Sequence, residues 1–273
     1  MNFYKMKTKK HYTVYENNPI IESGFEFGNG GHPYRYDPHH VINHIIKCRK
    51  SLGVSNNYLE IGVDQGATFD RILGTDIKHG VDPYGASPNI THRTTSQMFF
   101  SFNSYFFKQS YDIIFIDGIH LFPHVQQEIK DSLSILSDDG FIVLHDTCPF
   151  KKSAQDVLWT DFEKILQDVI SCDEKERLKW HENTKKNQPI GYNGDVWKNT
   201  AWYHCNTDYT VFSIPEACIS ILSKQHISSL ERKKTIKSLQ FDKMTWLFYY
   251  NYFQELMNPI SFEEFTKIFA EIK

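Results

Sequence analysis

The sequence predicts an α/β fold in which helices cover both faces of a mostly parallel sheet. Short apolar runs alternate with segments of helical periodicity from about residue 38 to residue 144, a pattern typical of parallel strands buried on both faces. The clearest strand is the run Tyr111-Asp112-Ile113-Ile114-Phe115-Ile116-Asp117. With 273 residues, 40% of them apolar, the chain can bury a large core without disulfides. We therefore expect one main α/β domain with additions.

The first part of this domain is predicted to begin with a helix over residues 38–52. Asp37 is placed to cap this helix, and Pro38 to occupy its first position. A buried strand over 58–63 leads into a glycine turn, followed by a helix over 68–73 and a second strand over 79–84. A weaker element surrounds residues 94–107.

The second part repeats the alternation. After the strand at 111–117 the pattern predicts a helix over 123–136, a turn at Asp139-Gly140 and a buried strand over 141–144. A helix is expected from 150 to 170, and residues 173–200 are polar and loop-like. Residues 203–214 alternate as a late or edge strand does, and the tail from residue 226 predicts two or three helices.

Composition and charge exclude several classes of protein. Thirty basic and 33 acidic residues give a net charge of −3, so no basic excess points to nucleic acid. The five cysteines are scattered and form no Cys-x-x-Cys pair, which favours a reducing compartment over a disulfide framework. No apolar stretch indicates a signal peptide or a membrane span. We therefore expect a cytoplasmic protein.

Charged side chains follow the predicted strands at the points where ligands bind in open α/β sheets. They are Glu60 and Asp64 at the end of the first strand, Asp82 at the end of the second, Asp117 and His120 at the end of the central one, and His145 and Asp146 at the end of the last. A single acid at a strand end can be a helix cap, but five carboxylates and two histidines exceed what structure requires. This set predicts a functional site at one edge of the sheet.

A glycine turn follows the first strand in the pattern Glu60-x-Gly62-x-x-x-Gly66. Glycines there let the backbone approach a ligand closely, and a carboxylate about 20 residues later, here Asp82, can accept the hydroxyls of a ribose. The pattern is not Gly-x-Gly-x-x-Gly, so a dehydrogenase is disfavoured. No phosphate-binding loop or nucleophile elbow occurs in the sequence.

Five segments in order carry a family resemblance. They are Glu60-x-Gly62-x-x-x-Gly66, Gly80-Val81-Asp82-Pro83-Tyr84, Phe115-Ile116-Asp117-Gly118-x-His120, Phe141-Ile142-Val143-Leu144-His145-Asp146-x-x-Pro149 and Gly191-Tyr192-Asn193-Gly194-Asp195-Val196-Trp197-Lys198. Together they resemble class I S-adenosylmethionine-dependent methyltransferases, and more narrowly the branch of macrolide-sugar O-methyltransferases and cephalosporin-hydroxylase-like proteins. The resemblance covers about residues 38–214.

The resemblance implies a Rossmann-like class I methyltransferase fold for the middle one of three regions, whereas the two flanking regions match no known family. Residues 1–37 are an N-terminal segment that could cover the active site, residues 38–214 the S-adenosylmethionine-binding methyltransferase domain, and residues 215–273 a C-terminal helical extension. It also implies which residues bind S-adenosyl-L-methionine and its product S-adenosyl-L-homocysteine. These are Glu60, Gly62, Gly66, Asp82, Tyr84, Ser96 and Asp117.

Methyl transfer to a sugar hydroxyl needs a base, a metal or both, because the hydroxyl is a poor nucleophile at neutral pH. In relatives a histidine spaced like His120 is the base and an aspartate like Asp117 ligates magnesium. Asp117 and Asp146 are hard ligands that suit Mg²⁺. His145 stands where relatives often have an acid or amide, and it suits manganese, iron or zinc, or acts itself as proton acceptor without a metal.

We thus expect an S-adenosylmethionine-dependent O-methyltransferase acting on a sugar hydroxyl. Its acceptor would be a nucleotide-linked sugar, a polysaccharide or a glycosylated natural product, with a divalent metal such as Mg or Mn left open. The alternatives are a phenolic or phosphorylated small acceptor, or a non-catalytic binding protein of the same fold. The expected partners are a small-molecule or sugar-nucleotide acceptor and a second copy of the chain, with no nucleic acid and no membrane span.

Overall fold

The fold is built on a six-stranded sheet with the strand order β2-β1-β3-β4-β6-β5. The computed structural model describes residues 34–150, 152–155, 193–230, 235–236, 238–240 and 244–271. The strands are β1 (Asn57–Ile61), β2 (Ile77–Val81), β3 (Tyr111–Ile116), β4 (Leu136–Leu144), β5 (Thr210–Ile214) and β6 (Ile219–Ser223). β2, β1, β3 and β4 run parallel, whereas β6 is antiparallel to both β4 and β5. This sheet confirms the predicted Rossmann-like α/β fold.

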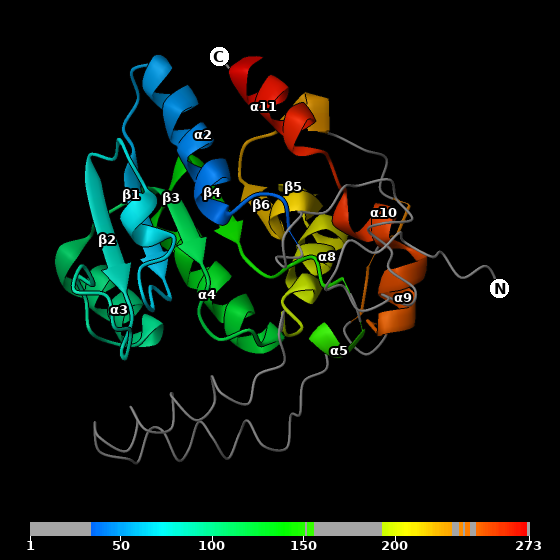
Figure 1. The fold of residues 1–273 in the computed structure, drawn as a ribbon, viewed down its shortest axis with the longest axis horizontal. Coiled ribbons are helices and arrows are strands. Elements are labelled where there is room, and N and C mark those ends of the chain that lie inside the picture. Colours follow the sequence, from blue (N-terminus) through cyan, green and yellow to red (C-terminus); the bar gives the residue numbers. More distant parts are fainter. Residues whose placement is uncertain are drawn as a thin grey trace, which may run out of the picture.

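Helices cover both faces of the sheet, as Figure 1 shows. The described helices are α2 (Pro38–Ser51), α3 (Ser96–Phe102), α4 (Phe122–Ile135), α5 (Lys152–Gln155), α8 (Trp197–Asn206), α9 (Trp246–Asn251), α10 (Phe253–Met257) and α11 (Phe262–Glu271). Alternate strand residues feed two separate hydrophobic clusters. One cluster packs α2 and α11 against the sheet, and the other packs α3, α4 and α8 against the opposite face. Period-two side-chain alternation therefore produces a three-layer molecule.

Helix α2 forms where the sequence predicts it. Pro38 occupies its first turn, and its buried side chains recur at helical spacing: Val41, Ile42, Ile45 and Ile46. Asp37 sits at the N-cap position with an extended backbone, but its side chain makes no capping hydrogen bond. It pairs instead with Arg71, whose Nη1 lies 3.3 Å from Asp37 Oδ2.

Two predicted elements differ from the structure, the helix over 68–73 and the turn at Asp139-Gly140, and the untyped element at 94–107 is now defined. Residues 68–73 form only the short 3-10 helix Phe69–Arg71. The weak element at 94–107 is α3 followed by a π-helical turn, Asn103–Phe107. Gly140 lies within β4 and not in a turn, at an irregularity where the β3–β4 register shifts. A Cβ at this glycine would come within 2.9 Å of the Asp112 carbonyl oxygen, so the glycine permits a bulge.

The C-terminal part differs more. Residues 197–206, predicted as loop and strand, form helix α8, and the edge strand is confined to β5. Strand β6 was not predicted, although it lies inside the sheet between β4 and β5. The sequence predicts that the methyltransferase domain ends at residue 214, but β6 of the same sheet lies beyond that residue. The predicted helices of the tail are confirmed as α9, α10 and α11. Most of the predicted 150–170 helix and the 173–192 loop fall outside the described residues.

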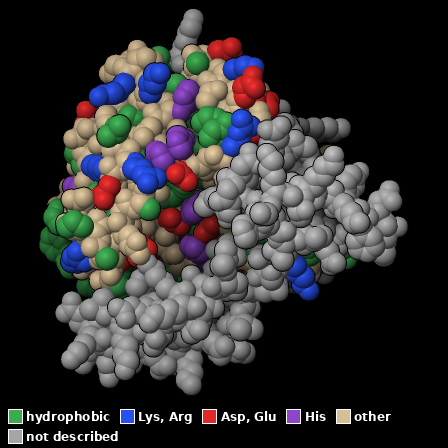
Figure 2. All heavy atoms as spheres, in the orientation of Figure 1, with side chains coloured by type: hydrophobic (Ala, Val, Ile, Leu, Met, Phe, Trp, Pro, Cys, Tyr) green, Lys and Arg blue, Asp and Glu red, His purple; other side chains and the backbone are tan. Residues whose placement is uncertain are grey.

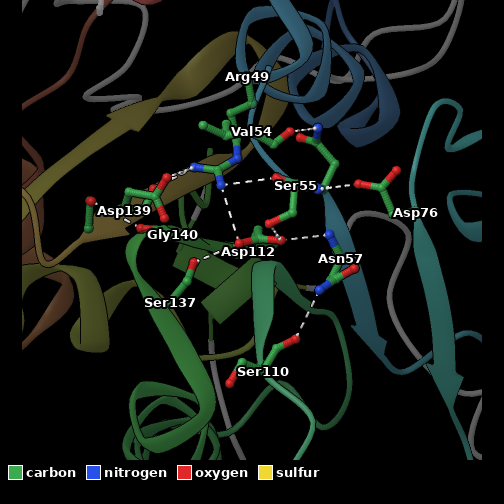
Figure 3. Close-up of polar contacts among 12 residues, drawn as sticks. Arg49, Val54, Ser55, Asn57, Asp76, Ser110, Asp112, Ser137, Asp139 and Gly140 are labelled. Carbon is green, nitrogen blue, oxygen red and sulfur yellow. Dashed lines mark hydrogen bonds and ion pairs between the residues drawn. The ribbon is translucent and has the colours of Figure 1, made fainter. Parts of the chain in front are cut away.

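A buried ion pair fastens the end of α2 to the amino-terminal edge of the sheet (Figure 3). Arg49 Nη2 lies 3.2 Å from Asp112 Oδ1, and both side chains are less than a tenth exposed. Asp112 also accepts hydrogen bonds from Ser55 Oγ, the Asn57 backbone N–H and Ser137 Oγ. This network lies at the opposite sheet edge from the strand ends predicted to bind ligands. Among the residues described, no helix is both long and apolar enough to span a bilayer.

Candidate active site

Parallel pairing of β3 and β4 brings the two central strand ends together. Ile116 is paired with Leu144, so the next residues, Asp117 and His145, emerge side by side. The backbone continues the ladder for one more step, because the His145 N–H donates to the Ile116 carbonyl at 3.1 Å. The sheet therefore brings Asp117, His145 and Asp146 to one place from positions almost 30 residues apart.

His120 joins these residues from the loop that leads into α4. Its Nε2 lies 3.4 Å from Asp117 Oδ1, and its Nδ1 lies 3.1 Å from Asp146 Oδ2. His145 Nδ1 lies 2.9 Å from Asp117 Oδ1 and 3.6 Å from Asp146 Oδ2. Each of the two imidazoles thus lies between the two carboxylates. We call these four residues, Asp117, His120, His145 and Asp146, the Asp-His cluster. In Figure 2, acidic and histidine side chains lie side by side in a recess of the surface.

In the Asp-His cluster, the charges of neighbouring side chains shift the pKa values more than burial does. Burial lowers the pKa of His145, but Asp117 and Asp146 raise it to about 10. For His120, burial again lowers the pKa, and the same two carboxylates raise it above its usual value. Burial raises the pKa of Asp117, yet the two histidines hold it well below its ordinary range. Without a bound cation the cluster is therefore a set of mutually stabilising ion pairs.

Three of these residues also form a donor set for a cation. One ligand atom each from Asp117, His120 and Asp146 all lie within 4.8 Å of one another. Carboxylate oxygens with an imidazole nitrogen suit Mn²⁺ and tolerate Mg²⁺. A second grouping, Asp37 with His39 and His40, has similar spacing. There Arg71 already pairs with the Asp37 carboxylate, which disfavours a second cation.

Asp146 is held by residues that the sequence analysis did not assign to the site. Its backbone has φ of +55°, which is rare for a residue other than glycine. Asn193 Nδ2 donates to Asp146 Oδ1 at 2.6 Å, and the Tyr34 hydroxyl lies 3.1 Å from the same amide nitrogen. Asn193 stood in the segment Gly191–Lys198 that carried the resemblance, but nothing in its local sequence indicated this long-range contact.

The two glycines of the turn after β1 allow it to pack closely against neighbouring segments. Gly62 has φ of +88°, and a Cβ there would overlap the carbonyl oxygen of Asp117. At Gly66, with φ of +82°, a Cβ would come within 2.9 Å of both the Asp70 carboxylate and Ser87 Oγ. The two glycines therefore let the loop after β1 lie directly against neighbouring segments. Gly62 in particular sets the distance between this loop and the Asp-His cluster.

Glu60 is buried behind the turn, with only 1% of its surface exposed. The Tyr58 hydroxyl donates a hydrogen bond to Glu60 Oε2 at 2.5 Å. Burial raises the pKa of Glu60 to about 8, against the opposite effect of that hydrogen bond. Glu60 is thus mostly a neutral acid at pH 7 and has no direct access to solvent.

Asp82 connects the loop after β2 with the loop after β1 through hydrogen bonds. Its Oδ2 accepts the Asp64 N–H at 2.8 Å, and its Oδ1 accepts the N–H groups of Tyr84 and Gly85 at 2.8 and 2.6 Å. A carboxylate offers about four acceptor positions, so three are used by backbone. Ser96 begins α3 and is buried, and no described contact joins it to Asp82 or to the Asp-His cluster.

Comparison with known proteins identifies the segment that carries this site. Residues 53–147 match the family model of a methyltransferase domain, which confirms the predicted resemblance to methyltransferases. The match runs from β1 to just beyond β4 and includes Glu60, Asp82 and the whole Asp-His cluster. No curated protein sequence matches the chain significantly.

Several solved methyltransferases resemble the chain at low identity. The MycE methyltransferase from the mycinamycin biosynthetic pathway, in complex with Mg and SAH, is 14% identical over 85% of this chain and 59% of its own, with a TM-score of 0.38. The plantazolicin methyltransferase BpumL, in complex with a pentazolic analog and SAH, is 15% identical over 52% and 54%, with a TM-score of 0.29. CcbJ from Streptomyces caelestis is 18% identical over 40% and 52%, with a TM-score of 0.26. The chain spans little more than half the length of these proteins, and the scores are too low to carry function across.

Proposed function

With a methyltransferase domain matched over residues 53–147, we propose that the protein is an S-adenosylmethionine-dependent O-methyltransferase acting on a sugar hydroxyl. The observation that carries this proposal is the Asp-His cluster at the carboxyl ends of β3 and β4. In this cluster the carboxylate oxygens lie within 3.6 Å of the imidazole nitrogens, and each of the four side chains is 9–24% exposed. Such a partly accessible group of proton acceptors and hard ligands suits activation of an alcohol.

The methyl donor is proposed to bind along the edge formed by the loops after β1, β2 and β3. Asp82 has about one acceptor position left for a ribose hydroxyl, because three backbone N–H groups occupy the others. Gly62 and Gly66 keep the loop after β1 close to Asp117, with Glu60 behind it. Tyr84 and Ser96 are proposed to flank the adenine. When bound, S-adenosylmethionine supplies an electrophilic methyl group and leaves as S-adenosylhomocysteine.

The proton-transfer residue is proposed to be His120. Its two ring nitrogens face Asp117 and Asp146, whose carboxylates raise its pKa and would stabilise the imidazolium. His120 would be free to take the acceptor proton once a cation held by the two carboxylates lowers that pKa. His145 contacts the same two aspartates and is the competing candidate. Because methyl transfer is an in-line displacement, the base must sit beside the acceptor oxygen, on the side away from the leaving sulfur.

Asp117 and Asp146 are proposed to hold a divalent cation. Their donor set fits Mg or Mn, with His120 near enough to be a third ligand. A bound cation would fix the acceptor oxygen and increase the acidity of its proton. If His120 ligates the metal, proton transfer falls to His145, whose pKa the cation would lower by neutralising Asp117 and Asp146.

The test is methyl transfer from S-adenosylmethionine to a panel of acceptors, followed by mass spectrometry of each product. The panel contains nucleotide-linked sugars, polysaccharide fragments and glycosylated natural products, together with phenolic and phosphorylated small molecules. We expect S-adenosylhomocysteine and a methylated sugar, and an Asp117→Asn control without activity. Exclusive methylation of phenols would overturn the acceptor class. Tight S-adenosylhomocysteine binding with no transfer to any acceptor would favour a binding protein.

Metal dependence is tested on the same assay by exhaustive chelation and add-back of Mg²⁺ or Mn²⁺. Loss of turnover that either ion restores supports the cation site. Full turnover after chelation, in protein shown to contain no metal, would leave the histidines as the only activating groups.

A further inference from the structure

We propose that Asn193 is a positioning residue that orients the Asp146 carboxylate, and that the turn 193–195 holds Asp146 and His120 in register. This inference deepens the proposed function and rests on it for its catalytic consequence. The positioning itself is a property of the contacts described next and can be tested without activity.

The two oxygens of Asp146 have separate partners. Oδ1 accepts the Asn193 amide at 2.6 Å, whereas Oδ2 faces His120 Nδ1 at 3.1 Å and His145 Nδ1 at 3.6 Å. Asp146 stands on a left-handed backbone with φ of +55°, which persists only when surrounding contacts hold it. The contact with Asn193 therefore directs Oδ2 toward the histidines.

Asn193 can do this because it is itself rigidly held. It is 1% exposed, and its backbone N–H donates to the Ala154 carbonyl at 2.8 Å. Its side chain contacts the Tyr34 hydroxyl at 3.1 Å and Cys218 Sγ at 3.3 Å as well as Asp146. An amide suits this place because its NH₂ group donates to a carboxylate. An aspartate of the same shape would set a second carboxylate against the first.

The same turn holds His120 through its backbone. Gly194 has φ of +61°, and a Cβ there would overlap the His120 carbonyl oxygen. The Asp195 N–H donates to that carbonyl at 3.3 Å. Asp195 Oδ1 accepts the Phe122 N–H at 2.6 Å, at the start of α4. Three consecutive residues thus connect the loop after β3 with the end of β4.

The expected consequence is loss of metal affinity and turnover without loss of donor binding. Outer residues that orient ligands typically contribute 10–100-fold to metal affinity or activity. No described contact joins Asn193 to the loops after β1 and β2, so S-adenosylhomocysteine affinity should stay within twofold.

The experiment compares wild type with Asn193→Ala and Asn193→Asp. The matched control is Asn56→Ala, which removes another fully buried asparagine at the opposite edge of the sheet. Calorimetry measures Mn²⁺ binding in the absence of acceptor and, separately, S-adenosylhomocysteine binding. Turnover is resolved into kcat and KM, and crystal structures of wild type and Asn193→Ala report the place of the Asp146 carboxylate.

We expect both Asn193 variants to bind Mn²⁺ and to turn over 10–100-fold less well than wild type. The loss should fall in kcat and not in the KM for donor, while Asn56→Ala keeps both properties. Asn193→Asp preserves side-chain shape, so it serves if Asn193→Ala does not fold. Wild-type Mn²⁺ affinity and kcat in Asn193→Asp would overturn the inference.

The crystal structures separate this inference from the proposed function. If wild type neither binds Mn²⁺ nor methylates any acceptor, the proposed function fails, but a displaced Asp146 carboxylate in Asn193→Ala still supports positioning. An Asp146 carboxylate in its wild-type place in Asn193→Ala would overturn the inference whatever the activity.

Discussion

At the scale of single residues, His120 and His145 compete for one role because both touch Asp117 and Asp146. We expect His120→Ala to lower kcat by about 10²–10⁴-fold, the usual contribution of a positioned base. S-adenosylhomocysteine affinity should remain near wild type, because the base acts in the transition state. Steady-state kinetics and calorimetry on the two alanine variants measure this.

The exposed His40→Ala serves as the control, with kinetics like those of wild type. Should His145→Ala abolish turnover while His120→Ala scarcely changes it, the base is His145. Unchanged turnover in both variants would point to an acceptor that reaches the site already ionised or is activated by metal alone.

Glu60 makes stability depend on pH in a direction opposite to that of an ordinary paired carboxylate. Its pKa in the folded protein is about 8, against 4.5 for the free side chain. The folded state therefore favours the protonated acid, and this stabilising contribution is complete below about pH 4.5 and is lost as the pH rises to about 8. Glu60→Gln imitates the neutral acid and removes that dependence.

We expect Glu60→Gln to gain stability relative to wild type as the pH rises from 5 to 8, by an amount on the order of a few kcal/mol. Urea unfolding of both proteins across this pH range measures the difference. Glu264→Gln, at an exposed position of α11, is the control and should follow wild type. Parallel curves for Glu60→Gln and wild type would show that Glu60 is ionised in the fold.

At the scale of elements, the attachment of α2 to the sheet depends on Arg49 and Asp112. Arg49→Ala leaves a carboxylate that is 95% buried without its counter-ion. Removal of one partner of a buried pair typically costs about 3–5 kcal/mol. Because three other hydrogen bonds to Asp112 remain, we expect Arg49→Ala to lower the free energy of unfolding by about 3 kcal/mol, the lower end of this range.

Chemical denaturation of Arg49→Ala measures this loss. The exposed Lys47→Ala in the same helix should stay within about 0.5 kcal/mol of wild type. Because the network lies far from the Asp-His cluster, S-adenosylhomocysteine affinity of folded Arg49→Ala should be unchanged. A loss below 1 kcal/mol would mean that water replaces the guanidinium at little cost.

At the scale of the whole molecule, an aromatic surface follows α3. Tyr105, Phe106 and Phe107 are 77%, 73% and 61% exposed, and the run from Ser96 to Phe107 contains no charged residue. Since a large aromatic side chain can bury about 150–250 Å², these three expose roughly 300–500 Å². That is about half of what one partner contributes to a standard interface. We expect the predicted homo-oligomer to form through this surface.

Light scattering coupled to size exclusion tests this expectation. Wild type should elute as an oligomer, and the double substitution Tyr105→Ser with Phe106→Ser should shift it to monomer. Leu73→Ser, which alters an equally exposed apolar residue elsewhere, should leave the assembly intact. A monomeric wild type at micromolar concentration would contradict the prediction.

Much of the sheet could be predicted from local pattern. Mostly apolar runs mark β1, β3 and the end of β4 because strands buried on both faces need no polar alternation. Helix α8 escaped prediction because polar residues occupy part of its buried surface, including Asn199, Thr200 and His204. Strand β6 is short and carries two buried serines, so its apolar signal is weak.

By itself, the sequence determined the chemistry available at the sheet edge. Asp117 and His145-Asp146 each follow an apolar run and Asp82 follows a shorter strand, and the carboxyl ends of parallel strands meet at one edge whatever the details of packing. The methyltransferase-like order of these motifs is likewise a property of the sequence. Local periodicity suffices for such features because each depends on a few neighbouring residues.

Only the tertiary structure decided how these groups face one another. That His120 lies between two aspartates, that Asn193 reaches Asp146 across 47 residues, and that Tyr34 reaches Asn193 across 159 are outcomes of chain packing. The position of β6 between β4 and β5 is decided in the same way. Such contacts depend on loop closure and on shape matching between distant segments, and no local pattern in the sequence encodes either.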